Sequence, residues 1–508
     1  MNTNLETKQT QQYGFLKKIE YFGNKLPNPA ILFLIMLFLL ALLSLVLATM
    51  KVSAIDPMTH KQIFVKSLFS REGLHWIMSD MVKNYVNFPP LGMIMVLTIG
   101  IGLVEKVGLL EVIIKAVIHS IPKRLVTVAI VLLSFFSHLA SDAAMVIVPP
   151  IAAMVFYSLG RHPFAGFGAS LAAIMSGFTA NLLIVTTDVL LSGITTQAAR
   201  LVDPNIVVTP VDNWYFMSFS VVYLTIATTL ITEKFVEPRL GKYQGSQEVH
   251  LEKVSTDEKR ALKTTGIATA IYFVILLLMV VPEGAPLRNP TTGTILNSPL
   301  MRGVVPLLFF FFITVGLTYG IKSKAIKNGN DAVKMMSEAM KGLAGFMVMV
   351  FAIAQFTAAF GWTNISVYMA TNGAEFLRSI NMTGLPALLG FMLFGQCIAL
   401  FVLSGSAVWS MLAPIFVPMF MLLGYNPAFV QLAFRAGDTS LNSINLVNPF
   451  LPLFLDVMRQ YKSDSGIGTY LSLMIPYAFS YMILWYVLFS AWYWLGLPIG
   501  PGVPQRLW

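Results

Sequence analysis

The sequence contains very little charge. Of its 508 residues only 11% are Asp, Glu, Lys or Arg, whereas 56% are hydrophobic. Because a soluble globular protein carries roughly 25% charged residues, this composition excludes an ordinary soluble domain. Apolar runs near the ~20 residues that cross a bilayer recur along the chain, without the alternation of a membrane strand, so we predict an all-α polytopic membrane protein. The clearest runs are Ala30–Met50, Leu125–Ala140, Trp214–Thr232, Gly266–Val281, Val304–Tyr319, Leu343–Gly361, Leu385–Leu403 and Tyr470–Leu495.

The sequence also lacks the residues that several chemistries require. Its one cysteine, Cys397, lies inside an apolar run, which excludes a disulfide framework and a cysteine metal site. There is no Walker-type glycine-rich segment ending in Lys-Ser or Lys-Thr, and no HExxH zinc motif. Where an intramembrane aspartyl protease is expected to have Gly-x-Gly-Asp, this chain has Arg435-Ala436-Gly437-Asp438. We therefore expect neither an enzyme nor a bound cofactor.

Positive charge is unevenly distributed among the hydrophilic stretches. Residues 233–263 carry seven Lys or Arg and residues 322–341 carry five lysines, whereas 283–302 carries two arginines. Since Lys and Arg concentrate in cytoplasmic loops, both basic stretches are predicted to lie in the cytoplasm and 283–302 outside. Four lysines place the N-terminal segment, 1–29, in the cytoplasm as well. The net charge of +10 thus reflects topology and predicts no nucleic-acid partner.

Two hydrophobic segments, one in each half of the chain, are interrupted by polar residues and prolines. They are SHLASDAAMVIVPP, residues 137–150, and LSGSAVWSMLAPIFVP, residues 403–418, and in each a serine precedes a proline by eight residues. Paired interruptions of this kind indicate the binding site of a transporter. Non-helical backbone at membrane depth survives only where protein or a water-filled cavity surrounds it. We therefore predict re-entrant hairpins near 137–158 and 403–424.

The two halves share further features. The cytoplasmic linker 233–263 divides the chain into transmembrane halves 30–232 and 264–508. Each interruption is followed by a Leu-Gly-x-x-Pro sequence, ending at Pro163 or Pro427, and an asparagine lies eighteen residues beyond each proline. We interpret this as a degenerate internal repeat, inverted in the membrane. The alternative is chance similarity between two membrane segments rich in serine and proline.

Ionisable and aromatic residues mark the second interruption as a ligand site. Arg435 and Asp438 are three residues apart, so on a helix they share a face. Either they form a structural ion pair, or Arg435 binds an anionic substrate while Asp438 handles a coupling ion. The tip Ser404-Gly405-Ser406 suits close approach of backbone to ligand. Trp409 beside it is a candidate for stacking on an aromatic ligand, with an interfacial position as the alternative.

The first interruption leads to a different polar cluster. Asp188 lies near Thr187 and Ser192, an oxygen-rich group suited to Na⁺ or to a proton. Asp142 either caps the following half-helix or takes part in ion binding. His138 fits a satisfied interior histidine better than a proton relay. Because no cation stands at this tip, we expect the first half to hold the coupling cation and the second half the substrate.

Six segments then resemble a known family across most of the chain. In order they are SHLASDAAMVIVPP, ANLLIVTTDVLLSG, DNWYFM, EPRLG, SGSAVWSMLAPIFVPMFMLLG and GLPIGPG. From about Tyr21 to the C-terminus the chain resembles the p-aminobenzoyl-glutamate transporter (AbgT) family, and within it the importers of p-aminobenzoyl-glutamate. The resemblance implies a homodimer of bowl-shaped subunits in the bacterial inner membrane. Each subunit is expected to have about nine transmembrane helices and two opposed re-entrant hairpins.

The resemblance also implies which residues act in transport. Family positions fall on Asp188, Ser406, Trp409, Pro427, Arg435 and Asp438. One position departs, because Leu446 stands where relatives place a proline. Taken with the reasoning above, the predicted substrate-binding residues are Ser404, Gly405, Ser406, Trp409, Arg435 and Asn445. The predicted ion-coupling residues are Asp142, Asn181, Asp188, Asp438 and Asn442, with a Na⁺ site expected near Asp188 or Asp438. The prolines expected to shape the hairpins are Pro149, Pro150, Pro414, Pro418 and Pro427.

The family substrate is an aromatic amine joined to a dicarboxylate, which suits an aromatic side chain and an arginine. The leading hypothesis is a secondary active transporter that imports p-aminobenzoyl-glutamate, coupled to a gradient of Na⁺ or H⁺. The alternative within this class is a proton-driven exporter of sulfonamide-type antimetabolites. From other classes, an intramembrane hydrolase lacks its motif, and two occluding hairpins favour alternating access over the open pore of a channel.

Overall fold

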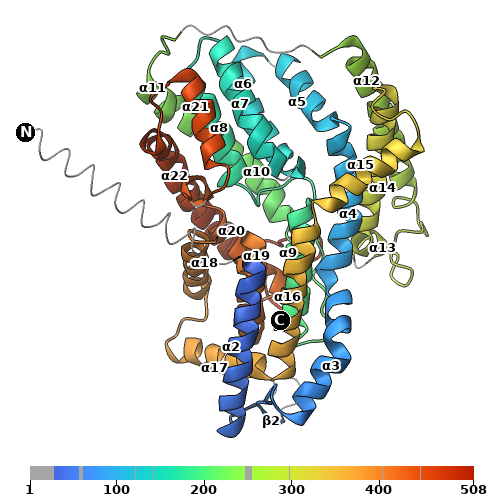
Figure 1. Cartoon of the computed structure of the whole chain (residues 1–508), viewed down its shortest axis with the longest axis vertical. Coiled ribbons are helices and arrows are strands. Elements are labelled where there is room, and N and C mark those ends of the chain that lie inside the picture. Colours follow the sequence, from blue (N-terminus) through green and yellow to red (C-terminus); the bar gives the residue numbers. More distant parts are fainter. Residues whose placement is uncertain are drawn as a thin grey trace, which may run out of the picture.

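The computed structural model describes residues 28–55, 61–120, 122–140, 142–245, 254–296, 298–402, 404–446 and 448–507. Nearly all of the N-terminal segment 1–29 and the middle of the linker 233–263 therefore lie outside the described residues, as does Ser141. Almost every element that is described is a helix (Figure 1), which confirms the predicted all-α class. A short antiparallel hairpin, β1 (Ser53–Ile55) and β2 (Gln62–Phe64), pairs Ser53 with Phe64.

Eight helical stretches of the described chain are long and apolar enough to cross a membrane, and three apolar helices are shorter. Six of the predicted runs coincide with such spans, because each is an uninterrupted apolar stretch of membrane length. The spans are α2 (Pro29–Thr49), α3–α4 (Arg71–Lys106), α10 with its extension (Trp214–Leu240), α12 (Thr256–Leu278), α14 (Val304–Lys322), α16 (Ala344–Trp362), α19 (Gly405–Leu422) and α22 (Ile467–Leu495). Further helices are α5 (Leu109–Ser120), α11 (Glu237–Leu240), α13 (Pro299–Arg302), α15 (Gly329–Lys341) and α17 (Ile365–Ser379).

One of these spans, Arg71–Lys106, is not among the apolar runs predicted from the sequence. It consists of α3 (Arg71–Val86) and α4 (Pro89–Lys106), which follow each other closely. The Ser70 hydroxyl accepts a hydrogen bond from the Gly73 amide at 3.0 Å, and Pro89 supplies a first helical residue that needs no N–H partner. Capping, rather than a continuous apolar run, therefore defines the start of this span.

The first interrupted segment forms two helices joined by a break. Helix α6 (Val126–Phe136) ends in a 3₁₀ turn, Ser137–Ala140, and α7 (Asp142–Ser158) follows. The apolar run 125–140 is thus not one membrane-length helix: the 11 residues of α6 span only about 16 Å, half the hydrocarbon core. Helix α8 (Pro163–Met175) comes next, and a second break separates it from α9 (Thr186–Ala199).

The second interrupted segment has the same order of elements. Helix α18 (Leu385–Ala399) breaks before α19, α20 (Pro427–Asp438) follows, and a break around the 3₁₀ turn Asn442–Ile444 leads to α21 (Leu451–Tyr461). In Figure 1 the α6–α7 pair lies in the upper part of the molecule and the α18–α19 pair lies below it. This common order supports the predicted internal repeat.

The corner before α8 and the corner before α20 are capped in the same way. The imidazole of His162 accepts a hydrogen bond from the Phe164 amide at 3.2 Å, and the side chain of Asn426 accepts one from the Ala428 amide at 2.9 Å. Each cap is followed by a proline at the first helical position. The Leu-Gly-x-x-Pro signature is therefore a helix stop followed by a helix start. The predicted hairpin prolines of α7 and α19 lie inside their helices.

Helices α9, α19 and α20 pack together at the centre of the molecule (Figure 1). All twelve residues of α20 are buried, including Arg435 and Asp438. Helix α4 packs between α9 and α14, and α12 lies outside α14. Helix α12 buries only Ala261 and Thr265, which leaves its apolar side chains for lipid or another protein surface. The polar groups of the two interrupted segments thus converge at the centre.

Candidate functional site

A cavity of about 530 Å³ lies between the two interrupted segments. The first half contributes Met145, Met175, Phe178, Thr179, Thr187, Leu190 and Leu191. The second half contributes Phe401, Val402, Ser404, Gly405, Ser406, Phe434, Asp438, Asn442, Pro449 and Phe450, and α2 adds Pro29 and Leu32. The volume is in the range of sites for small organic ligands, and such sites combine apolar walls with a few polar groups. We call this space the central cavity.

Asp438 is the one ionisable residue among the described residues that line the central cavity. Asp438 is the last residue of α20 and is only 5% exposed. Within the described chain its carboxylate has no hydrogen bond and no ion pair. A Cβ atom built on Gly405 would lie 2.7 Å from its Oδ2 atom. A side chain at position 405 would therefore displace the carboxylate, so glycine allows this close approach. The tip Ser404-Gly405-Ser406 and the Asp438 carboxylate thus lie side by side in the central cavity.

Arg435 does not pair with Asp438, so of the two alternatives the structural ion pair between these residues is wrong. The guanidinium instead reaches across to the first half, where its Nη2 atom lies 2.6 Å from Oδ1 of Asp188 and 3.0 Å from the Thr179 carbonyl oxygen. The second carboxylate oxygen of Asp188 accepts a hydrogen bond from the Val185 amide at 2.8 Å. The three-residue spacing of Arg435 and Asp438 along α20 did not identify the partner of the arginine. Its long side chain reaches a carboxylate on another helix instead.

This ion pair is buried and joins the two halves of the chain. The side chains of Arg435 and Asp188 are 1% and 4% exposed. Burial of two charges is costly and is offset only when their geometry and further hydrogen bonds are favourable. The Nε atom of Arg435 is buried without an acceptor. The guanidinium therefore retains an unused donor next to its ion pair with Asp188.

His138 and Asn181 extend this polar group. The imidazole Nδ1 of His138 lies 2.9 Å from Oδ1 of Asn181, and its Nε2 lies 3.3 Å from the Ile174 carbonyl oxygen. The Asn181 amide nitrogen lies 3.5 Å from the Asp188 carboxylate. Both ring nitrogens of His138 thus have partners, as expected for an interior histidine. Asn181 connects it to the ion pair rather than to the central cavity.

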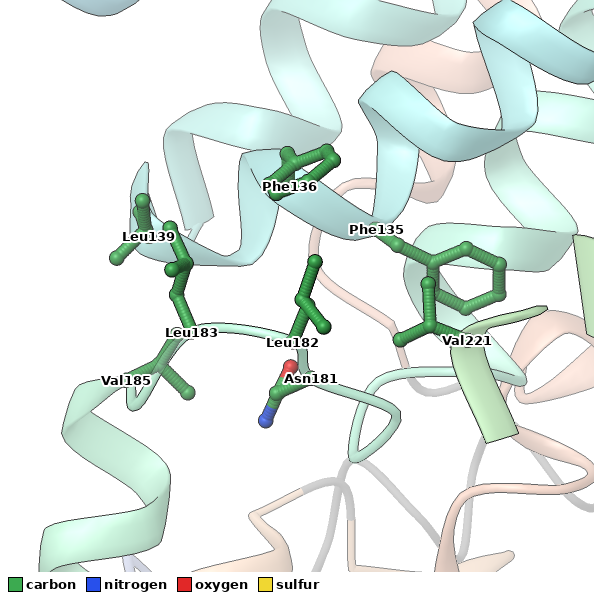
Figure 2. Close-up of a pocket in the computed structure, with 8 residues that line it drawn as sticks. All are labelled: Phe135, Phe136, Leu139, Asn181, Leu182, Leu183, Val185 and Val221. Carbon is green, nitrogen blue, oxygen red and sulfur yellow. The ribbon is translucent and has the colours of Figure 1, made fainter. Parts of the chain in front are cut away.

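Asn181 also borders a second, much smaller cavity, drawn in Figure 2. Its volume of about 10 Å³ gives room for a single water molecule. Figure 2 shows the other labelled side chains to be apolar, contributed by α6, the 3₁₀ turn after it, the α8–α9 break and α10. Those residues are Phe135, Phe136, Leu139, Leu182, Leu183, Val185 and Val221. A substrate with carboxylates finds neither the space nor the cations here.

Trp409 lies one layer behind the central cavity. Its indole is fully buried and stacks on the Phe434 ring, with centroids 4.7 Å apart and planes 24° apart. Its N–H donates to the Thr195 hydroxyl at 2.9 Å, and that hydroxyl donates to Gln431 at 2.5 Å. In this conformation a ligand ring in the cavity meets Phe434 rather than Trp409. Phe434 precedes Asp438 by four residues, so helical spacing alone would have found it.

The remaining predicted residues have varied surroundings. Ser404 caps α19, since its hydroxyl accepts from the Ala407 amide at 3.3 Å and lies 3.1 Å from the Ser406 hydroxyl. Asn442 lines the central cavity. Asn445 is buried away from it and donates to the Ala399 carbonyl at 3.0 Å. This contact secures the break after α20 although Leu446 replaces the family proline. The backbone of Asp142 begins α7, and its side chain lies outside the described residues.

Comparisons with known proteins agree with this architecture. A family model described as the AbgT putative transporter family matches residues 14–507. The p-aminobenzoyl-glutamate transport protein of Escherichia coli K12 is 44% identical over 495 residues, which cover 97% of each chain. The Alcanivorax borkumensis YdaH transporter superposes with a TM-score of 0.90 at 35% identity, covering 94% of this chain and 100% of its own. Neisseria gonorrhoeae MtrF, which represents a class of antimetabolite efflux pumps, gives a TM-score of 0.91 at 37% identity, covering 96% and 100%.

Proposed function

Because this chain belongs to the AbgT transporter family, we propose that it is a secondary transporter that imports p-aminobenzoyl-glutamate together with a coupling cation. The observation that carries the proposal is the 44% identity, over 97% of both chains, to a protein named for transport of this compound. The similarity to an efflux pump is lower, at 37%. An antimetabolite exporter is therefore the second candidate rather than the first.

The central cavity suits the two chemical ends of this substrate. Phe178 and Phe434 offer aromatic faces to the aminobenzoyl ring. The unused Nε donor of Arg435 lies behind the same wall, and a guanidinium binds carboxylates through parallel hydrogen bonds. We propose that a substrate carboxylate competes with Asp188 for Arg435. The substrate would then loosen the ion pair that ties the halves together, which links binding to conformational change.

The charges of the site explain why a cation should accompany the substrate. A dicarboxylate brought next to the Asp438 carboxylate adds negative charge inside the membrane, where unpaired charge is expensive. We propose that the coupling ion sits at Asp438, since both carboxylate oxygens of Asp188 already have partners. The hydroxyl groups of Ser404 and Ser406 and the side chain of Asn442 line the same cavity. Among the described residues no group of three His, Cys, Asp or Glu could hold a metal ion. Na⁺ would be bound by the Asp438 carboxylate together with hydroxyl and carbonyl oxygens, and H⁺ by the carboxylate alone.

The subunit arrangement and the orientation are part of the proposal. The exposed apolar face of α12 supports either a lipid-facing position or contact with a second copy, and we propose a homodimer in the inner membrane. The basic stretches 233–263 and 322–341 support a cytoplasmic N-terminus, which we include in the proposal.

Uptake by reconstituted protein tests this function. Purified protein in liposomes should accumulate radiolabelled p-aminobenzoyl-glutamate when a Na⁺ or a proton gradient is imposed separately, and one of the two should suffice. The Asp438→Asn variant should lose the dependence on that gradient while keeping its fold. Extrusion of a sulfonamide without any uptake of p-aminobenzoyl-glutamate would identify the exporter instead. Unchanged cation dependence in Asp438→Asn would remove Asp438 from coupling.

A further inference from the structure

A second large cavity, of about 920 Å³, opens at the other ends of the same central helices. It is bordered by the loop after α9, by α13 and the start of α14, by the corner before α20 and by the C-terminal segment 501–507. Residues 301 and 302 belong to the stretch 283–302, which the charge pattern predicts on the side of the membrane opposite the cytoplasm. We call this space the vestibule.

Helices α9 and α20 connect the vestibule to the central cavity. On α9, Thr187 lines the central cavity and Arg200, at the C-cap, lines the vestibule, while Asp188 and Arg200 are separated by about 18 Å of helix. On α20, Asp438 lines the central cavity and Pro427 lines the vestibule. The two spaces are thus consecutive along one path.

Buried side chains separate the two spaces. The Trp409 indole donates to Thr195, Thr195 donates to Gln431, and the Gln431 amide donates to Asn213 at 2.9 Å. All four side chains are buried. A ligand in the vestibule therefore reaches the central cavity only after this layer moves.

The vestibule contains two arginines without carboxylate partners. Arg200 uses only its Nε–H, which donates to the Ile206 carbonyl at 3.3 Å, and Arg302 is exposed at the end of α13. Neither takes part in an ion pair within the described chain. The acidic residue that lines the vestibule is Asp212, whose carboxylate accepts hydrogen bonds from the amide and the hydroxyl of Thr209. With two arginines and one aspartate, the described residues that line the vestibule carry a net positive charge.

We propose that the vestibule is a first binding site for dicarboxylates, in which Arg200 and Arg302 capture the anionic end of the substrate before it enters the central cavity. This deepens the proposed function and rests on it for the identity of the substrate. Two guanidinium groups offer paired donors that match carboxylate geometry. Positive charge at the mouth of a cavity also raises the rate of encounter with an anion, and salt weakens this effect.

Uptake kinetics in right-side-out vesicles test the vestibule. The variant Arg200→Gln/Arg302→Gln should raise the KM for p-aminobenzoyl-glutamate about fivefold to tenfold at low ionic strength, with the maximal rate per folded protein unchanged. The KM of the wild type should rise with salt, because charges are screened beyond about 10 Å at 0.1 M ionic strength, whereas the KM of the double variant should not. Arg200→Lys/Arg302→Lys should restore the salt dependence.

Lys83→Gln is the matched control. Lys83 is an exposed cation on α3, with a side chain that is 67% exposed, and it does not line the vestibule. A KM for the double glutamine variant equal to that of Lys83→Gln at both salt concentrations would overturn the vestibule site.

Binding of glutarate to the detergent-purified proteins separates this proposal from the proposed function. The wild type should bind this simple dicarboxylate more tightly than the double variant, whichever aromatic compound is transported. Absence of p-aminobenzoyl-glutamate uptake in the wild type contradicts the proposed function, while weaker glutarate binding by the double variant still supports the vestibule. Equal glutarate binding by the two proteins overturns it.

Discussion

Arg435 is expected to stabilise the fold through its ion pair with Asp188 and also to act in transport. A single substitution of Arg435 would change both properties at once. Arg435→Ala leaves the Asp188 carboxylate buried without its cation, which is expected to cost about 3–5 kcal/mol of stability. The double variant Asp188→Asn/Arg435→Gln removes both charges and should recover most of this loss. We expect thermal unfolding in detergent to show that recovery, while uptake stays absent in both variants. Recovery of transport in the double variant would show that the arginine serves the fold and not the substrate.

Asp212 should make stability depend on pH. Burial raises the pKa of this loop carboxyl to about 6, and the hydrogen bonds from Thr209 oppose the rise. Because the folded pKa lies above the ordinary value, the stabilisation is fully present below pH 3.8 and is lost as the pH rises through about 6. Asp212→Asn cannot ionise, and its side-chain oxygen can still accept from Thr209. The variant should therefore gain about 1–2 kcal/mol over the wild type at pH 7.5 and little at pH 4.5.

Thermal unfolding measured across this pH range checks the prediction. Thr292→Gln, an exposed change in another loop of the same face, serves as the control. A difference between Asp212→Asn and wild type that is the same at both pH values would contradict it.

At the scale of elements, a bidentate arginine holds one corner of the helical bundle. Arg161, between α7 and α8, donates to both oxygens of Glu237 at 2.8 Å and 2.5 Å and to the Thr127 hydroxyl at 2.8 Å. Its guanidinium also lies 4.1 Å from the Phe156 ring centroid. Lysine cannot reproduce this fork, so Arg161→Lys should lower stability by about 1–2 kcal/mol despite its conserved charge.

Thermal unfolding of Arg161→Lys beside Lys115→Arg checks the corner. Lys115 forms an ion pair with Glu111 on the same helix. Its control variant replaces lysine by arginine, the reverse of the exchange at Arg161. Equal stability of Arg161→Lys and wild type would show that charge alone suffices there.

The sequence predicted elements well where one property decided them. Long apolar runs identified α2, α12 and α14, because hydrocarbon thickness alone sets their length. It failed for α3, whose polar residues sit within a spanning helix, and for α6, which is apolar but stops at half a membrane. For α3 the local signal is the capping serine rather than an apolar run. For α6 neighbouring helices determine where the backbone can leave helical geometry, and an apolar run does not report those neighbours.

The sequence could predict which residues belong to the candidate site, but not which side chains they contact. Four residues named from the sequence, Ser404, Ser406, Asp438 and Asn442, line one cavity. The partner of Arg435 came from 247 residues away, and periodicity within α20 could not select it. Trp409 was expected to contact the ligand, but the side chain of Phe434 covers its ring. Long-range packing decides such choices.

At the scale of the whole molecule, the charge pattern makes a prediction about sidedness. In a Cys397→Ser background, a cysteine placed at Thr292 should react with a membrane-impermeant maleimide in intact cells. A cysteine at Lys327 should react only after the membrane is opened. Both positions are exposed, so differences in reactivity report the side of the membrane. The reverse pattern would invert the topology and would place the vestibule on the cytoplasmic side.

The buried ion pair has an electrical consequence for the transport cycle. Arg435 and Asp188 carry opposite charges 2.6 Å apart, so together they form a dipole with no net charge. The membrane potential performs about 2.3 kcal/mol of work per elementary charge per 100 mV, and it performs almost none on such a pair. Among the described residues that line the central cavity, Asp438 is then the group on which voltage acts when the empty transporter reorients. A bound cation would cancel that sensitivity, so the state of Asp438 decides which step of the cycle the membrane potential drives.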